Sequence, residues 1–417
     1  MHTTPSTASR VPARAAPIAP RSPRSGRRFA LVAAVVAALL VLPAPGAFAA
    51  WSDVPNNHWA KVAIDYVAAD RDWMRDYGAS TFRPGTVETR LLLARAAVFA
   101  FDPSGTPDRA ITFSDLPAND PLWRYANVAV KNGWLQPNGA GAFRPDGAMT
   151  LNTLYRTIVL GLGLTGAVAG LKAIHLADGT PVPHTQHFPY LQVGMTIGLR
   201  YNHPDEATDV LPGQALTRDE VAWALYRAAT APSWKLDEAD RFAALTLPNM
   251  TATKLQMVVF GLKSVGYPYV YAGEWNVASP PGYCCGYQPQ GGFDCSGLVW
   301  WVVRSPGGGY DNTAIRGYQG WSLPERSSST MAAVGTHISW TAKAAGDLLF
   351  YTSPISHVDL YVGRGWALDS SSSRGGVALQ WIVDGWYFDE FQWGRRLSPG
   401  PSSPYRGLPP ENLLDGG

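Results

Sequence analysis

The chain has 417 residues, a formal net charge of +2, an apolar content of 46% and a charged content of 16%. This length predicts two or three folded units, and the apolar content excludes a largely disordered protein. Residues 1–49 contain six arginines and no acidic residue, so removing them changes the net charge from +2 to −4. A mildly acidic remainder excludes the basic footprint that is typical of nucleic-acid-binding proteins.

Residues 1–49 are typical of an export signal. An Arg-, Pro- and Ser-rich start ends at Arg27 and Arg28, and an apolar stretch follows at 29–42. Ala47 and Ala49 then supply the small residues that a signal peptidase reads. The apolar stretch is too short to span a bilayer comfortably, so we expect cleavage that leaves no stable membrane span. An uncleaved membrane anchor is the alternative.

Three related units follow the signal. Each is predicted to form a helix, a loop and a second helix, and their bounds are 51–104, 112–165 and, for a degenerate third copy, 172–231. A spacing of seven residues recurs between an apolar residue and a threonine: Phe82 and Thr89, Phe143 and Thr150, Val210 and Thr217. Each threonine suits a helix N-cap. Because so short a unit cannot bury its apolar face alone, we expect the three units to pack together.

These units resemble S-layer homology domains. The first contains the SDVP-x-x-HWA opening at 52–60, the central FRP and the closing Thr-Arg pair. The resemblance implies binding of an anionic secondary cell-wall polymer in a groove lined by Trp59, Arg90 and Arg218. The second unit has Leu151 where the arginine is expected. A purely structural helical repeat is the alternative.

The remaining sequence divides into three segments. Residues 232–250, which include two prolines, are predicted to be a linker. Residues 251–396 contain the motifs described next and are predicted to form a second domain. Residues 397–417 are rich in Pro, Ser and Gly and are predicted to be a flexible tail.

A cysteine stands at a predicted helix start in the sequence GGFDCSGLVWWVVR, residues 291–304. Asp294 can cap this helix, which places Cys295 at its N-terminus. Partial positive charge at that position favours the nucleophilic thiolate, and the free N–H groups could stabilise an oxyanion. The other two cysteines are adjacent, at 284 and 285, and could form a strained vicinal disulfide or stay reduced. An odd number of cysteines leaves at least one free thiol.

A nucleophilic cysteine requires a base, and the base requires an orienting group. His357 opens an alternating segment, ISHVDLYVG, that predicts a strand with Val358, Leu360 and Val362 on one side. A tight turn at 363–365 would bring Asp369 on the next strand beside His357. A turn former is the alternative role for Asp369.

The separated motifs PYVY, DCSGL, GDLLF and SHV-x-x-YVG resemble those of the NlpC-type cell-wall cysteine peptidases, over residues 251–395. The resemblance implies an α+β papain-like domain, in which the cysteine helix packs on an antiparallel sheet that carries the histidine, after an all-α repeat region. It also implies hydrolysis of peptidoglycan peptide stems, usually between D-glutamate and the diamino acid, with no metal or cofactor.

The same resemblance implies roles for single residues. Cys295 would be the nucleophile, His357 the general base and later acid, and Tyr269 a neighbour of the nucleophile. Asp294 and Ser296, which flank Cys295, are predicted to contact substrate. A buried core aromatic is the alternative for Tyr269.

Asp369 departs from the family pattern, because the third polar residue there is commonly His and sometimes Asn or Gln. A carboxylate can still orient an imidazole, and it would favour the charged ring more strongly. Two other functions stay open: an amidase of the related CHAP type, and a wall-binding scaffold with an inactive peptidase fold.

Overall fold

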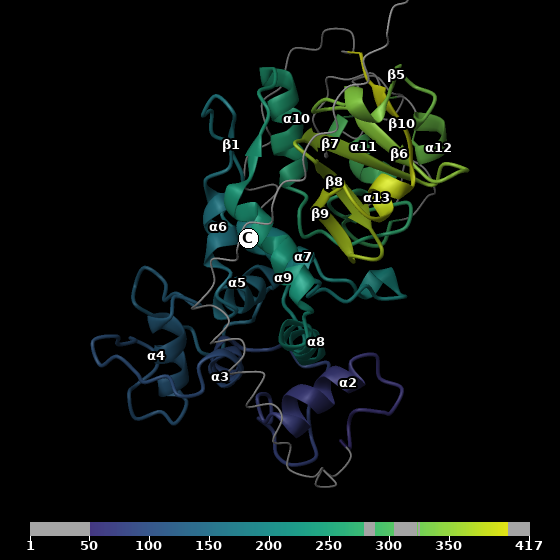
Figure 1. Cartoon of the computed structure of the whole chain (residues 1–417). Helices are drawn as coiled ribbons and strands as arrows, with labels where there is room; N and C mark the ends of the chain where they lie inside the picture. Colours follow the sequence, from purple (N-terminus) through teal and green to yellow (C-terminus); the bar gives the residue numbers. More distant parts are fainter. Residues whose placement is uncertain (1–50, 279–287, 304–322, 324–325, 399–417) are drawn as a thin grey trace, which may run out of the picture. The chain divides into compact units, whose positions relative to one another are not determined.

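The computed structural model describes residues 51–278, 288–303, 323 and 326–398 (Figure 1). The predicted export signal, Cys284, Cys285 and nearly all of the predicted tail lie outside these residues. Within the described ranges, no helix combines the length and the apolar character needed to cross a membrane.

The N-terminal part of the described chain is almost entirely helical. Its helices are α2 (Lys61–Ile64), which continues as the π-helix η1 (Asp65–Asp70), α3 (Arg90–Phe101), α4 (Trp123–Lys131), α5 (Leu151–Gly161), α6 (Thr165–Lys172), α7 (Phe188–Ile197), the 3-10 helix η2 (Glu206–Thr208) and α8 (Arg218–Ala229). Thr89, Thr150 and Thr217 stand at the N-caps of α3, α5 and α8, as predicted. The first two accept a hydrogen bond from the backbone N–H three residues on, whereas the hydroxyl of Thr217 donates to Asp219.

The three units pack on one another in a cyclic order. The closing helix of the first unit begins on the loop of the second, where the N–H of Arg90 donates to Gly147 O at 2.9 Å. The helices of the second and third units begin in the same way on the loops of the third and first. The bonds there run from Asn152 N to Pro212 O (3.0 Å) and from Arg218 N to Thr86 O (2.9 Å). Each unit therefore covers its neighbour, as the short repeat predicts.

Arg218 has a structural role in this packing. Its side chain is fully buried, its Nε donates to the carbonyl of Phe82 at 2.9 Å, and it pairs with Asp76 at 2.9 Å and Glu88 at 2.8 Å. Buried charges are stable only when they are paired and hydrogen-bonded, and the guanidinium fork of Arg218 meets that requirement. The prediction that Arg218 lines a polymer groove is therefore wrong in this structure, because no part of it reaches the surface.

The loops of the other two units also accept a hydrogen bond from an arginine side chain, as the carbonyl of Phe82 does from Arg218. Arg90 donates from Nε to the carbonyl of Phe143 in the second unit at 2.8 Å. In the third unit, the corresponding carbonyl is that of Val210, and the preceding helix α5 begins with the apolar Leu151. Arg200, which follows α7, donates to Val210 O at 2.9 Å. A guanidinium therefore reaches the corresponding carbonyl in all three loops, but in the third unit it comes from a different helix.

The C-terminal part is a mixed α+β fold around one antiparallel sheet (Figure 1). Its strand order is β5-β10-β6-β7-β8-β9. The strands are β5 (Thr336–Ile338), β6 (Leu348–Tyr351), β7 (His357–Gly363), β8 (Trp366–Ser371), β9 (Gly376–Trp381) and β10 (Phe391–Arg396). The helices are α10 (Ala252–Leu262), α11 (Cys295–Val303), α12 (Ser328–Met331), the 3-10 helix η4 (Trp340–Ala342) and α13 (Trp386–Asp389), and a small ribbon pairs β3 (Glu274–Trp275) with β4 (Gly292–Phe293).

Helix α11 packs on β7 and β8. Val358, Leu360 and Val362 are fully buried in the main core, and the odd-numbered residues of β7 lie on the other face of the sheet. The predicted fold class, an antiparallel sheet with a cysteine helix packed on it after an all-helical repeat region, is confirmed. The exception is a short parallel pair, β1 (His175–Leu176) with β2 (Thr246–Leu247), that the sequence did not indicate.

Residues 232–250, predicted to be a linker, are folded and packed. They contain α9 (Ser233–Asp240), η3 (Arg241–Ala244) and β2. Phe242 is fully buried and stacks on Trp366 at 4.8 Å, which explains why this segment does not behave as a solvated linker. Next to it, the side chain of Gln192 on α7 exchanges hydrogen bonds of 2.7 and 3.0 Å with the backbone of Leu379 on the edge strand β9. The third repeat therefore continues into the core of the C-terminal part.

Candidate active site

The sheet register brings three titratable side chains together on one face. Leu360 pairs with Leu368 across β7 and β8, so continuing this antiparallel register places Asp359 opposite Asp369. His357 lies two residues before Asp359 and therefore on the same face. The turn that aligns the two strands runs through Gly363, Arg364 and Gly365, all with positive φ, at the predicted position.

The ring of His357 lies between two carboxylates. Its Nε2 is 3.0 Å from Asp359 Oδ1 and 3.0 Å from Asp369 Oδ1, although neither oxygen lies well along the N–H direction. Burial alone would lower the pKa of His357, but the charges of Asp369 and Asp359 raise it well above its ordinary value. A charged imidazolium is therefore the favoured state of this ring.

The two carboxylates differ in their surroundings. Burial and the neighbouring Asp369 raise the pKa of Asp359 to about 7. Burial acts on Asp369 in the same direction, but His357 and the hydroxyl of Tyr387, which donates to Oδ2 at 2.6 Å, hold the pKa of Asp369 below its ordinary range. Asp369 is therefore the carboxylate that carries the charge beside the ring, and Asp359 is the one that more readily takes a proton. A turn-forming role for Asp369 does not fit, since it is 2% exposed within β8.

Cys295 opens helix α11, as the sequence predicted, and its thiol is free and partly exposed. Sγ lies 4.0 Å from the carbonyl oxygen of Ser356, the residue that precedes His357. The carboxylate of Asp294 caps the helix by accepting from the N–H of Gly297 at 2.5 Å. Gly297 is required here, because a Cβ at this position would lie 1.8 Å from the carbonyl oxygen of Gly273.

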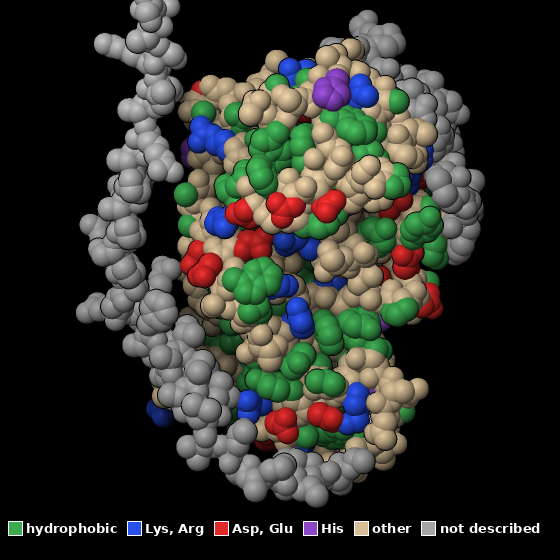
Figure 2. Space-filling model, turned by 45° about the vertical axis from the view of Figure 1, so that its right-hand side comes forward, with side chains coloured by type: hydrophobic (Ala, Val, Ile, Leu, Met, Phe, Trp, Pro, Cys, Tyr) green, Lys and Arg blue, Asp and Glu red, His purple; other side chains and the backbone are tan. Residues whose placement is uncertain are grey.

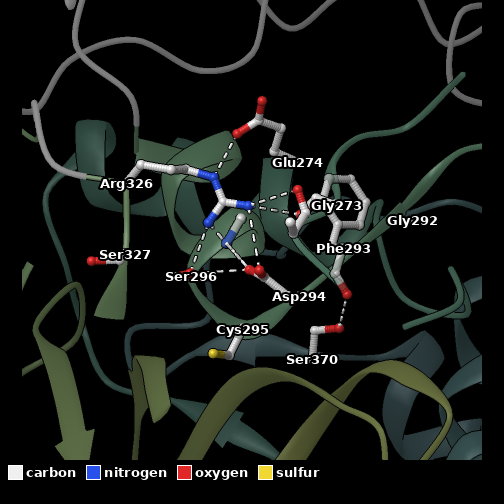
Figure 3. Close-up of polar contacts among 12 residues, drawn as sticks. Gly273, Glu274, Gly292, Phe293, Asp294, Cys295, Ser296, Arg326, Ser327 and Ser370 are labelled. Carbon is white, nitrogen blue, oxygen red and sulfur yellow. Dashed lines mark hydrogen bonds and ion pairs between the residues drawn. The ribbon is translucent and has the colours of Figure 1, made fainter. Parts of the chain in front are cut away.

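A buried arginine holds the start of this helix (Figure 3). Arg326 donates to Glu274 at 2.5 Å, to the hydroxyl of Ser296 at 2.7 Å and to Asp294 at 3.3 Å. The Sγ of Cys295 points away from this guanidinium. Asp294 and Ser296, predicted to contact substrate, instead direct their polar atoms to Arg326 and so fix the position of Cys295. Ser296 is only 5% exposed, which does not favour a contact with substrate, whereas the side chain of Asp294 is 14% exposed and its contact with substrate stays a prediction.

Tyr269 lies beside the site. Burial, together with the charges of Asp294 and Cys295, raises the pKa of its hydroxyl, and the charge of His357 acts on it in the opposite sense. Tyr269 is only half-buried, so it is not a core aromatic. Trp386 of α13 has its ring 5.7 Å from that of His357 and is 47% exposed. Each of these two aromatic side chains thus lies near a residue of the predicted Cys–His pair.

His357, Asp359 and Asp369 also form the one cluster among the described residues with three possible metal-ligand atoms, all within 4.8 Å of one another. The ring and the carboxylates contact each other directly at 3.0 Å, so ion pairing within the cluster explains why these three side chains lie together.

The residues predicted to bind wall polymer differ in their exposure and contacts. Trp59 is partly exposed and stacks on Tyr201 with ring centroids 4.5 Å apart, beside Trp223. Arg90 is partly exposed, but it uses Nε and Nη2 to hold the loop of the second unit. Trp59 and Arg90 thus retain accessible surface that Arg218 lacks.

Sequence reasoning missed Asp359 and Arg326. The alternation that placed His357 on one face of a strand also places Asp359 there, so the signal was present in the motif. Arg326 carried no such signal, because it reaches Glu274 and Asp294 from a position 52 and 32 residues away in the chain.

Two families match parts of the chain. Residues 266–396 match the NlpC/P60 family, and residues 112–151 match the S-layer homology domain. Both resemblances drawn from the motifs are confirmed. The S-layer match lies on the second unit, although the first unit carries the more complete motifs.

Individual relatives agree with the C-terminal match. A probable endopeptidase of Mycobacterium tuberculosis is 32% identical over 116 residues, which is 28% of this chain and 23% of that protein. A probable endopeptidase of Corynebacterium glutamicum is 31% identical over 110 residues, 26% of this chain and 45% of that protein. The chain therefore spans less than half the length of these curated relatives. Among solved structures, the chain is similar to RipD of Mycobacterium tuberculosis, with 23% identity over 35% of this chain and 98% of that chain and a TM-score of 0.26. RipD is described as a non-catalytic NlpC/p60 domain protein adapted to peptidoglycan binding.

Proposed function

We propose that this chain is an exported, wall-associated cysteine endopeptidase that hydrolyses peptide stems of peptidoglycan at the D-glutamyl–diamino acid bond. One observation carries the proposal: Cys295 stands at the N-terminus of α11, with Sγ 4.0 Å from the carbonyl oxygen of Ser356, and the next residue, His357, has its ring between two buried carboxylates. This arrangement provides a nucleophile, a base and an orienting group.

The reaction follows from this arrangement. Because the carboxylates engage Nε2 of His357, Nδ1 is the ring nitrogen left for the thiol of Cys295. The thiolate attacks the scissile carbonyl, and the first free N–H groups of α11 stabilise the oxyanion. The imidazolium of His357 then donates its proton to the leaving amine, and the neutral ring activates the water that hydrolyses the thioester. Asp369 keeps the ring in the required orientation and stabilises its charged form.

The repeat region supplies the attachment to the wall. An S-layer homology match supports cell-wall association, and we assign the contact with an anionic secondary wall polymer to Trp59 and Arg90. The stacked rings at Trp59 suit a sugar, and the partly exposed guanidinium of Arg90 suits an anionic group. Arg218 maintains the fold of the three units instead.

Digestion of purified peptidoglycan tests the enzymatic part. We expect the wild-type chain to release peptides whose mass and new N-terminal diamino acid identify an endopeptidase cut, and Cys295→Ala to release none. The variant Cys284→Ala/Cys285→Ala is the matched thiol control and should stay active. Release of complete stems cut from the glycan would indicate the CHAP-type amidase. Pelleting with walls but no release by the wild type would indicate the inactive scaffold.

The attachment is tested separately with the full chain carrying Cys295→Ala, which cannot degrade the wall that it binds. We expect it to pellet with purified walls, and to pellet less after Trp59→Ala or Arg90→Ala. Extraction of the secondary polymer from the walls should abolish pelleting. Equal pelleting on extracted walls would contradict the assignment of an anionic polymer.

A further inference from the structure

A cleft of about 750 Å³ opens beside His357, and both parts of the described chain line it. One wall comes from the end of α7, from α8 and from α9. The other consists of His357, the loop at 371–375 and α13. His357, the proposed base, therefore shares a cavity with the third repeat and the segment that follows it.

The charge of this cleft is one-sided. Among the described residues, four cations besides His357 line it, Arg200, Arg227, Lys235 and Arg374, and no carboxylate does. On the face of the molecule drawn in Figure 2, by contrast, acidic and basic side chains are interspersed. The cleft is thus a local concentration of positive charge.

Two of these cations are held side by side. A Cβ on Gly198 would lie 2.5 Å from Lys235 Nζ and 3.2 Å from Arg227 Nη2, so both groups converge on the left-handed turn that ends α7. Arg227 uses Nε to donate to Gly198 O at 3.1 Å. Lys235 forms no ion pair with any residue that the structure describes. Burial, together with the nearby charges of Arg227 and Arg374, lowers the pKa of Lys235.

One carboxylate lies near these cations. Glu238 pairs with Arg374 at 3.1 Å and its charge also acts on Lys235, but one carboxylate cannot balance the charges of Arg227, Lys235 and Arg374 together. Arg200 is 8% exposed, donates to the carbonyls of Val210 and Gly266, and has a buried Nε without a partner. Like charges held together in a partly buried cleft repel each other, and an anion between them relieves that repulsion.

We infer that Arg227 and Lys235 form a carboxylate-binding subsite of the peptidase, so that the third repeat and α9 help to select the substrate. This inference rests on the proposed function and names its substrate class: stem peptides with a free carboxylate next to the scissile bond. A guanidinium and an ammonium bind a carboxylate through charge-assisted hydrogen bonds. A substrate whose carboxylate is converted to an amide loses that charge and is the poorer ligand.

The position of His357 on the same cleft favours the stem over the wall polymer as the source of the anion. Cys295 does not line the cavity itself, but its Sγ lies 4.0 Å from the carbonyl oxygen of Ser356, the residue before His357. We therefore expect a peptide whose scissile carbonyl reaches Cys295 to extend into this cavity. The serines at 371–373 add hydroxyl donors on the peptidase side.

Two synthetic stem peptides test the subsite, one with the free carboxylate on the D-glutamyl residue and one with the amide. For the wild-type full chain we expect a KM for the acid about tenfold below that for the amide, the effect of one charge-assisted contact. Lys235→Gln should raise the KM for the acid about tenfold and leave the amide nearly unchanged. Lys263→Gln removes a lysine that does not line the cleft and should behave as the wild type.

Equilibrium binding to the full chain carrying Cys295→Ala separates this inference from the proposed function. A wild type that cleaves neither peptide would contradict the endopeptidase, whereas tighter binding of the acid than of the amide, lost on Lys235→Gln, would still support the subsite. Equal affinity for acid and amide, or an equal loss for both in Lys235→Gln, would overturn the inference. Displacement of the acid by inorganic phosphate at equal concentration would also overturn it, because the cleft would then be a general anion site.

Discussion

Because two carboxylates lie beside His357, we predict that catalysis survives the loss of either one alone. At 3.0 Å and an effective dielectric constant of about 20, each carboxylate can stabilise the imidazolium by up to about 5 kcal/mol before the cost of burial is subtracted. Loss of one leaves the other at the same distance from Nε2. Loss of both leaves burial unopposed, which lowers the pKa of His357 below its ordinary value.

The expected rates follow from this geometry. Asp369→Asn should lose roughly 10- to 100-fold in kcat/KM, because Asp359 still orients the ring and the new amide oxygen can accept from the ring N–H. Asp359→Asn should lose less, since Asp369 carries the charge. The double variant Asp359→Asn/Asp369→Asn should lose on the order of 10⁴-fold, the effect of removing an orienting carboxylate from a catalytic triad.

Steady-state hydrolysis of a soluble stem peptide between pH 5 and 9 measures these effects. The basic limb of the kcat/KM profile, which reports the imidazolium, should shift to lower pH in each single variant and furthest in the double variant. Asp389→Asn, which removes an exposed carboxylate on α13, is the control and should leave the profile unchanged. A single Asp369→Asn variant that loses as much as the double variant would refute the shared role of Asp359.

Three further predictions concern stability and positioning. Burial and Asp369 raise the pKa of Asp359 to about 7, above the value of about 4 in the unfolded chain. The proton on Asp359 therefore contributes stability that is fully present below about pH 4 and is lost as the pH rises to about 7. The Tm of Asp359→Asn, measured by calorimetry, should fall less between pH 5 and 8 than the Tm of the wild type. Arg218→Met leaves Asp76 and Glu88 buried without their partner and should lower the free energy of unfolding by about 3–5 kcal/mol in urea titrations. A free energy of unfolding equal to that of the wild type would show that these carboxylates are neutral in the fold. Arg326→Lys cannot hold Glu274, Asp294 and Ser296 at once, so kcat should fall about 10- to 100-fold while KM changes little; an equal change in KM and an unchanged kcat would argue against a role in placing Cys295.

The sequence predicted the local parts of the site because their signals are local. A cap, a glycine and an apolar run define the helix of Cys295, and strict alternation defines the strand of His357. The partners of these residues could not be predicted in the same way. Arg326 reaches the helix start from a distant segment, and only the register between β7 and β8 shows that Asp359 and Asp369 share one ring nitrogen.

The prediction that Arg218 binds wall polymer was wrong for a related reason. A threonine–arginine pair reads as a surface motif, yet the structure buries Arg218 against the carbonyl of Phe82, and Arg90 makes the same contact with Phe143. The cyclic packing of the three units requires one cation for each loop, and this requirement is invisible in a single repeat.

The third repeat shows how this requirement connects anchoring to catalysis. Its loop carbonyl, Val210 O, cannot be reached from the start of α5, because Leu151 stands there, and Arg200 supplies the guanidinium from the end of α7. From that position the same side chain donates to the carbonyl of Gly266 and lines the cleft beside His357. The loss of the Thr-Arg arginine in the second unit, at Leu151, is thus coupled to the contact of the third unit with the C-terminal part. An arginine at position 151 could reach the third loop as Arg90 and Arg218 reach theirs, and the segment after α7 would then be free of that constraint.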